Sequence, residues 1–247
     1  MTASPTATPP AAAPPNPPDP AQRETARPRA DFPALPTYAH RSPIYGVGHA
    51  VCRITTTLAF DLKAYGVKNV PKTGGVLIVA NHQSYLDPVI LGVPMPRILS
   101  FLAKRELFEG QRPIGRLFAS LIRNLNAFPV RQGEGDVGAV RETIRRLQEG
   151  HVLTMFPEGG RSDSEEIDPM QGGVGLIVRR AGPTVRVVPA AIDGAFKAWP
   201  RQRKLPRPWP IRVSYGAARQ LAHLKAAEIV KIIDTDIRRL YADLRNK

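Results

Sequence analysis

Residues 76–88 read VLIVANHQSYLDP, and the character of this stretch changes in its middle. Its first five residues are apolar or small and include β-branched side chains, which predicts a short buried strand. Polar residues follow, and Asp87 with Pro88 predicts the start of a helix, with Asp87 as the N-cap and Pro88 at the first helical position. His82 is therefore expected in a loop between a strand and a helix.

The same succession of a strand and a polar turn recurs along the chain. Further strands are predicted at 126–130, 152–156, 185–192 and 211–215, and further helices at 137–147 (with Asp136 as N-cap), 172–181 and 219–245. Strands that alternate with helices indicate an α/β fold, here a single domain with a mainly parallel mixed sheet flanked by helices. Ligands of such sheets bind beyond the carboxyl ends of the strands, so the active site is expected there.

The beginning of the chain differs from the rest in composition. Residues 1–36 contain 11 of the 26 prolines and 9 alanines, and they show no periodic apolar face. Such a segment cannot bury enough apolar surface to offset its chain entropy. Residues 1–37 are therefore predicted to be a disordered Pro/Ala-rich tail, and 38–247 to be the folded domain.

The charge of the chain favours a polyanionic partner. The formal net charge is +14, and the tail contributes none of it because its three arginines cancel its three acidic residues. Nucleic acid, an anionic membrane surface and phosphorylated substrates are the candidates. Aromatic residues are only 6% of the chain and no nucleic-acid-binding motif occurs, so nucleic acid is not expected.

Two segments suit a membrane surface, although neither is long and apolar enough to span it. Residues 44–60 are compatible with an interfacial helix or, equally, with a packed N-terminal helix. Residues 199–209, WPRQRKLPRPW, interleave basic and Trp residues, which suits the headgroup layer; the alternative is a solvated basic loop whose Trp residues pack on the domain. Cys52 is the only cysteine, which excludes an intrachain disulfide and indicates a reducing compartment.

His82 and Asp87 are candidates for acid–base chemistry. On one continuous helix, residues five positions apart would lie about 140° from each other, so they could not pair. Across a loop the chain can fold back, and the Asp87 carboxylate can accept the imidazole N–H and set its tautomer. The other ring nitrogen would then serve as a general base. The alternative is a capping aspartate beside a loop histidine without chemistry.

Residues 156–162, FPEGGRS, place a carboxylate and a guanidinium on a turn after another predicted strand. Arg161 suits bidentate binding of a phosphate, while Glu158 can hold a substrate hydroxyl or anchor an arginine. A surface turn with a local ion pair between Glu158 and Arg161 is the alternative.

Together, these stretches resemble conserved blocks of the glycerophosphate and lysophosphatidate acyltransferase family. The first block of that family is Asn-His, any residue, Ser, two residues, Asp, which matches Asn81, His82, Ser84 and Asp87. Its third block, Phe-Pro-Glu-Gly, any residue, Arg-Ser, matches residues 156–162 throughout, and its fourth, an apolar stretch around a proline, matches 187–191. The resemblance covers roughly residues 75–195.

The resemblance implies an O-acyltransferase with specific roles for these residues. His82 would take the proton from an acceptor hydroxyl, with Asp87 orienting the ring, while Glu158, Gly159 and Arg161 would bind the glycerophosphate part of the acceptor. The acyl donor would be acyl-CoA or acyl-acyl-carrier protein, and neither a metal ion nor a redox cofactor is implied. Ser84 is interpreted as structural, bonding to nearby backbone.

The second block departs from the family pattern of Gly, five residues, Arg. Asn126 stands in place of the glycine and Gln132 in place of the arginine. Arg131, one position earlier, is the candidate substitute in substrate binding, although strand alternation would point it to the other face. The departure leaves the identity of the acceptor open.

The expected function is that of a 1-acylglycerol-3-phosphate acyltransferase, cytoplasmic and peripherally bound to the inner face of the cell membrane. It would make phosphatidic acid in phospholipid biosynthesis. An acyltransferase for another lysophospholipid, an ornithine-type lipid or a lipid precursor is the first alternative. A non-catalytic, basic lipid- or nucleic-acid-binding protein is the alternative from a different class.

Overall fold

The computed structural model of the chain describes residues 43–104, 127–130 and 137–246. The predicted tail lies outside the described residues, and so do Asn126, Arg131, Gln132 and Asp136. The boundary predicted between the tail and the domain therefore stays a prediction.

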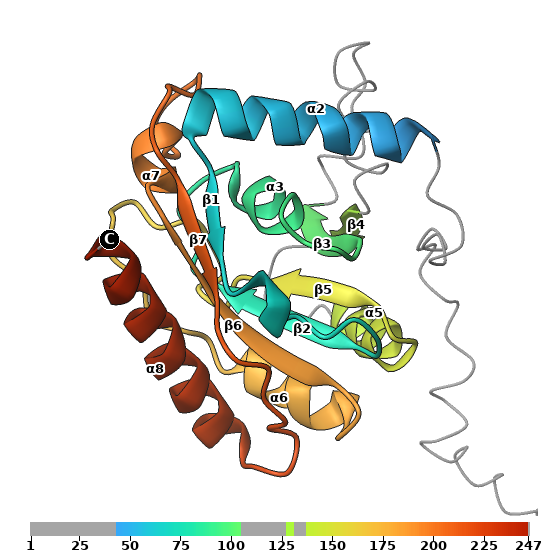
Figure 1. Cartoon of the computed structure of the whole chain (residues 1–247). Coiled ribbons are helices and arrows are strands. Elements are labelled where there is room, and N and C mark those ends of the chain that lie inside the picture. The colour runs from blue at the N-terminus through green and yellow to red at the C-terminus, as the bar shows by residue number, and fades with distance from the viewer. Residues whose placement is uncertain (1–42, 105–126, 131–136, 247) are drawn as a thin grey trace, which may run out of the picture. The chain divides into compact units, whose positions relative to one another are not determined.

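Seven strands form one sheet in the described part of the chain (Figure 1). They are β1 (Lys63–Tyr65), β2 (Val76–Ala80), β3 (Leu99–Lys104), β4 (Ala127–Val130), β5 (Val152–Met155), β6 (Arg186–Asp193) and β7 (Arg212–Tyr215). Their order across the sheet is β1-β7-β6-β2-β5-β3-β4. The β6–β7 pair is antiparallel, and the other neighbouring pairs are parallel. These pairings confirm the predicted α/β fold with a mainly parallel mixed sheet.

Two of these strands were not predicted from the sequence. β1 has only three residues and pairs with β7 alone, so its alternation is too short to detect. β3 reads LSFLAK, in which Ser100 and Lys104 do not alternate regularly with the apolar residues, so periodicity does not identify it as a strand.

Helices cover both faces of the sheet. They are α2 (Pro43–Phe60), α3 (Asp87–Gly92), α5 (Val137–Gln148), α6 (Gly173–Ala181), α7 (Ala195–Ala198) and α8 (Ala226–Arg245), with one 3₁₀ turn, η1 (Val67–Asn69). Figure 1 shows α8, α6 and α5 on one side of the sheet and α2 and α3 on the other. This arrangement confirms that helices flank the sheet on both faces.

The centre of the core is β2. All five of its residues are fully buried, because β6 and β5 pair with its two edges and helices cover both faces. A strand in this position has to be apolar throughout, which explains the unbroken run VLIVA. The carboxyl end of β2 consequently delivers Asn81 and His82 to the edge of the sheet where a site was expected.

Two predicted helix starts are wrong. The N-cap of α3 is Leu86, and Asp87 is the first helical residue. The Asp87 carboxylate turns back toward the preceding loop and accepts hydrogen bonds there, so it does not cap the helix. α8 begins at Ala226 and not at 219, since Arg219 is extended and exchanges two backbone hydrogen bonds with Val187.

Candidate active site

The site forms where the loops after β2 and β5 meet. These two strands are neighbours and parallel, with Val76 opposite Val152 and Val79 opposite Met155. Their carboxyl ends therefore point the same way and bring residues 81–87 against residues 156–162. The two blocks that are about 70 positions apart in the sequence become one site.

Asn81 attaches the end of β2 to β6. Its side-chain amide donates to the Ile192 carbonyl at 2.9 Å, and its carbonyl oxygen accepts the Ile192 N–H at 2.8 Å. Asn81 is fully buried, so both partners would lack a hydrogen bond without it. In the sequence, Asn81 is recognised only as a member of the first family block, and nothing there predicts its contact with Ile192.

His82 and Asp87 lie in contact, as the folding-back of the loop predicts. His82 Nδ1 is 2.7 Å from Asp87 Oδ2, and the same oxygen accepts the N–H groups of Gln83 at 2.7 Å and Ser84 at 2.8 Å. Asp87 is fully buried, whereas the His82 side chain is 20% exposed. An Nδ1–H that donates to the carboxylate leaves Nε2 as the proton acceptor on the accessible side of the ring. The catalytic roles of both residues stay predictions.

Three residues of the second loop hold His82 from the other side. Glu158 Oε1 accepts the His82 N–H at 2.6 Å, and the Ser162 N–H donates to the His82 carbonyl at 2.8 Å. The Phe156 ring stacks on the imidazole with the ring centroids 4.0 Å apart and the planes inclined by 15°. Both backbone groups of His82 and one face of its ring are thus bound by residues 156–162.

Glu158 bridges two segments of backbone. Its second oxygen accepts the Asp168 N–H at 3.1 Å. Burial raises the pKa of its carboxyl from 4.5 to about 7; the two backbone hydrogen bonds oppose this rise, and the carboxylates of Asp168 and Asp87 add to it. In the described part of the chain Glu158 forms no ion pair with Arg161, so the simple surface turn is excluded.

Arg161 is oriented by an aromatic side chain. Its guanidinium carbon lies 3.5 Å from the centroid of the Tyr85 ring, and the Tyr85 ring lies 5.2 Å from that of Trp199. Arg161 Nη1 is buried and has no hydrogen-bond partner among the described residues, so this donor is available to an anionic ligand. Tyr85 occupies a position that the block leaves variable, and sequence reasoning missed it.

The remaining predicted residues have backbone roles or lie outside the description. Gly159 has a φ of +78°, which favours glycine, and it closes a turn by donating its N–H to the Phe156 carbonyl. The Ser84 hydroxyl is buried; it donates to the Trp199 carbonyl at 2.8 Å and accepts the Leu86 N–H at 3.2 Å. Arg131 is outside the described residues.

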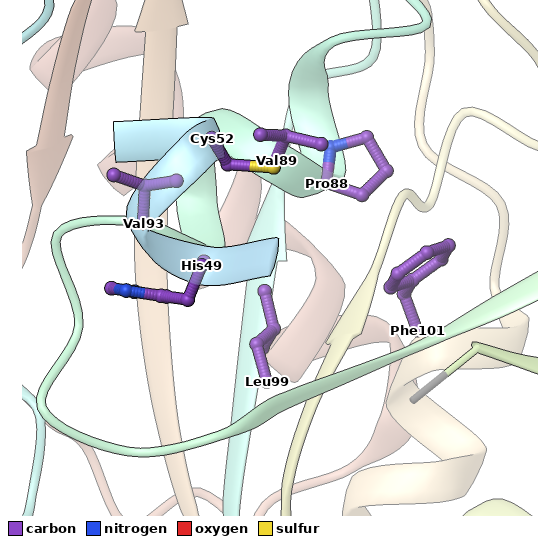
Figure 2. Close-up of a pocket in the computed structure, with 8 residues that line it drawn as sticks. His49, Cys52, Pro88, Val89, Val93, Leu99 and Phe101 are labelled. Carbon is purple, nitrogen blue, oxygen red and sulfur yellow. The ribbon is translucent and has the colours of Figure 1, made fainter. Parts of the chain in front are cut away.

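An apolar pocket lies between α2, α3 and β3 (Figure 2). None of the site residues described above lines it, although Pro88 follows Asp87 in the sequence. Its lining residues are His49, Cys52, Pro88, Val89, Gly92, Val93, Leu99 and Phe101. Figure 2 shows Cys52 beside Val89, with Leu99 and Phe101 on the other side of the pocket.

A model of the Acyltransferase family matches residues 61–193, which is more than half of the chain and includes both loops. The chain belongs to the acyltransferase family. This membership confirms the resemblance and the predicted enzyme class.

Several acyltransferases of known name are similar to the chain. It is 29% identical over 143 residues to a 1-acyl-sn-glycerol-3-phosphate acyltransferase of Bacillus subtilis, covering 58% of this chain and 67% of that protein. A lyso-ornithine lipid O-acyltransferase of Pseudomonas aeruginosa is 29% identical over 144 residues, covering 58% of this chain and 51% of that one. Among four of the curated relatives that it matches, the chain spans between 38% and 67% of the relative's own length.

A match to a solved structure covers more of this acyltransferase than the sequence matches do. The crystal structure of the 1-acyl-sn-glycerophosphate acyltransferase PlsC from Thermotoga maritima matches with a TM-score of 0.68 and 25% identity. The match covers 83% of this chain and 81% of that chain. It supports the α/β fold.

Metal and membrane features were also sought in the described residues. They contain no cluster of three or more His, Cys, Asp or Glu side chains suited to a metal ion. None of the described helices is long and apolar enough to cross a membrane. The absence of a cofactor stays a prediction.

Proposed function

We propose that this acyltransferase moves an acyl chain from acyl-CoA or acyl-acyl-carrier protein to the free hydroxyl of 1-acylglycerol-3-phosphate, which yields phosphatidic acid. The observation that carries the proposal is the placement of a His82–Asp87 pair and an oriented Arg161 on adjoining loops. The first is suited to deprotonate a hydroxyl, and the second to bind the phosphate of the same acceptor. The names of the similar proteins from B. subtilis and T. maritima support this acceptor.

The chemistry assigned to His82 is general base catalysis. Nε2 takes the proton of the acceptor hydroxyl as the oxygen attacks the thioester carbonyl; the new C–O bond forms, the C–S bond breaks, and the departing thiolate receives the proton from the imidazolium. Asp87 stabilises the imidazolium and holds the ring in the required tautomer. No acyl-enzyme is needed, and Ser84 is unsuited to form one because its buried hydroxyl donates to the Trp199 carbonyl.

The phosphate of the acceptor is assigned to Arg161. The buried Nη1 supplies an N–H donor, and Tyr85 keeps the guanidinium in place from one face. Arg131 is retained as a second candidate for this phosphate, as the sequence suggested. Gly159 would contribute by shaping the turn between Glu158 and Arg161.

We assign the apolar pocket beside α3 to an acyl chain of one of the substrates. A hydrocarbon chain needs a water-poor groove. Most of the lining of this pocket is apolar, and two of its residues, Pro88 and Val89, follow Asp87 in the sequence (Figure 2).

We also propose that the enzyme binds peripherally to the inner face of the cell membrane. α2 exposes Val47, Val51, Ile54 and Leu58, each more than half exposed and spaced to form one apolar stripe. The end of α2 lies next to the residues that follow the basic segment 199–209, because the Ile211 N–H donates to the Phe60 carbonyl at 2.8 Å. An apolar stripe on α2 and the exposed basic residues of 199–209 are the features that suit an anionic bilayer.

Vesicle sedimentation tests this membrane proposal. The protein should bind vesicles of phosphatidylglycerol more strongly than vesicles of phosphatidylcholine, and less so as salt rises. Val51→Asp should reduce binding roughly tenfold, because it puts a charge into the apolar stripe. Thr57→Asp, which adds the same charge outside the stripe, is the matched control. Equal binding of both variants would contradict the assignment of the stripe.

A panel of donors and acceptors tests the reaction. Purified protein is supplied with acyl-CoA or acyl-acyl-carrier protein, and with lysophosphatidate, a lysophospholipid with a neutral headgroup, or a lyso-ornithine lipid. Lysophosphatidate should react fastest, and His82→Ala should lower its rate by at least ~10²-fold while the protein stays folded. A His82→Ala protein with near-normal turnover would remove the base assignment.

The same panel separates the alternatives. Faster turnover of the lyso-ornithine lipid would support the second candidate, for which the similar P. aeruginosa protein is the motivating observation. If no thioester is consumed with any acceptor while vesicles still bind, the chain acts as a basic lipid-binding protein. An Arg161→Ala variant that loses activity only toward phosphate-bearing acceptors would support phosphate recognition by this residue.

A further inference from the structure

We propose that Glu158 is a positioning residue: through the backbone of His82 it sets the place of the general base, and it does not bind the acceptor. The inference rests on the proposed role of His82 and differs from the substrate-binding role that the family resemblance implies. Its basis is the set of contacts between residues 156–168 and His82.

The first observation concerns the hydrogen-bonding capacity of the carboxylate. Each oxygen of Glu158 is directed at one backbone N–H group, that of His82 at 2.6 Å and that of Asp168 at 3.1 Å. A carboxylate that accepts from backbone N–H groups forms charge-assisted hydrogen bonds, which are stronger than neutral ones. Both oxygens are thus engaged within the protein, while the nearby Arg161 keeps a donor without a partner. Arg161 is the better ligand for the acceptor.

The second observation concerns what these bonds hold. The His82 N–H goes to Glu158 and the His82 carbonyl receives the Ser162 N–H, so both dihedral angles next to its α-carbon are constrained by one loop. Phe156 supports the ring and Asp87 sets its rotation. Glu158 is the one side chain in this set that determines where the backbone of the base lies.

The third observation concerns the support behind Glu158. Asp168 follows Ile167, whose carbonyl accepts a hydrogen bond from Arg238 of α8 at 3.1 Å. The Gln171 N–H donates to the Pro157 carbonyl at 2.8 Å and closes the segment back onto the second loop. Glu158 therefore connects the base to a segment that is itself anchored to α8. An error of about 1 Å in the placement of a catalytic group can cost ~10²-fold in rate, so this anchoring has a catalytic consequence.

Steady-state kinetics of Glu158→Gln with lysophosphatidate as acceptor tests the proposal. The amide keeps the size of the side chain but offers one acceptor oxygen, so one of the two N–H groups faces an NH₂ group. We expect kcat to fall roughly 10- to 100-fold and the KM for lysophosphatidate to change less than about threefold, since misplacement of the base affects the chemical step. A tenfold or larger rise in KM with kcat unchanged would overturn the proposal.

Two further variants control the measurement. Glu166→Gln removes an equal charge from an exposed position in the same segment and should leave both constants unchanged. If Glu158→Gln does not fold, Glu158→Asp replaces it, because the shorter carboxylate keeps the charge but reaches fewer N–H groups; the same loss confined to kcat is expected. Circular dichroism and thermal unfolding establish which variants are folded.

A readout without turnover separates this proposal from the proposed function. The amide proton of His82, in a short bond to a carboxylate, should resonate at unusually low field in the NMR spectrum of the wild-type protein, and should move upfield in Glu158→Gln. If the wild type turns over no acceptor but this shift is seen, the function fails and the backbone contact stands. If the shift is absent, the positioning proposal fails whatever the activity.

Discussion

The loops after β2 and β5 serve His82 in different ways. In the proposed mechanism residues 81–87 supply the general base and its partner, and the contact between His82 and Asp87 forms within the loop, across five positions. Residues 156–162 bind the backbone and the ring face of His82 from 74 to 80 positions away. In the proposed mechanism the first loop carries the base, while the second holds the base in place and binds the acceptor phosphate, so substitutions in the two loops should differ in kind and in size.

The largest effect is expected from Asp87→Asn in the first loop. The amide can no longer accept the Nδ1–H as a carboxylate does, so the tautomer is lost, and the N–H groups of Gln83 and Ser84 lose a charged acceptor. We expect kcat to fall by about 10²- to 10⁴-fold, measured in single-turnover assays. Asp87→Glu, which keeps the charge, is the comparison variant, and equal activity of Asp87→Asn and wild type would remove the proposed division between the loops.

A smaller effect, on stability, is expected from Asn81→Ala at the start of the same loop. The substitution leaves the buried N–H and carbonyl of Ile192 without partners. Each orphaned group costs roughly 1–3 kcal/mol, so the free energy of unfolding should fall by about 2–6 kcal/mol. Urea titration measures it. Asn81→Asp sets a carboxylate oxygen against the Ile192 carbonyl in a fully buried place and should cost at least as much as alanine. A stability loss below ~1 kcal/mol for alanine would contradict the bridging role.

Tyr85→Leu tests whether the binding of the acceptor phosphate by Arg161 can be weakened without affecting His82. Loss of the stacked ring under Arg161 should raise the KM for lysophosphatidate by roughly 3- to 10-fold and leave kcat nearly unchanged, since a cation–π contact is worth about 0.5–2 kcal/mol. Tyr85→Phe keeps the ring and should behave as wild type. A fall in kcat alone would indicate that Tyr85 acts on His82.

The smallest effect concerns Glu158 and pH. Because the pKa of its carboxyl is about 7 in the folded protein and 4.5 in the reference state, the folded state holds this proton more tightly than the unfolded one. The contribution of Glu158 to stability should therefore decrease as pH rises from 4.5 to about 7. Urea unfolding of wild type and Glu158→Gln at several pH values isolates this slope, which the variant should lack. An identical pH dependence in both proteins would show that burial does not raise this pKa.

Several parts of the molecule could be predicted from local pattern alone. The run VLIVA predicts β2 because a central parallel strand is buried on both faces. The loop between a strand and a helix start predicts that His82 and Asp87 can meet, and they do. The helix start itself is misassigned at one position, since Asp87 uses its carboxylate for the preceding loop rather than for the N–H groups of α3.

The sequence by itself thus determined the type of fold, the two chemical blocks and the pair His82–Asp87, because these depend on periodicity and on neighbours within a few positions. Only the tertiary structure decided that Glu158 accepts the His82 N–H and that Tyr85 stacks on Arg161. The same holds for the two hydrogen bonds between the Asn81 side chain and the backbone of Ile192. These contacts join residues 76 to 111 positions apart. They exist because β2 lies between β6 and β5, an order of strands that arises from the packing of the whole sheet and that no local pattern encodes.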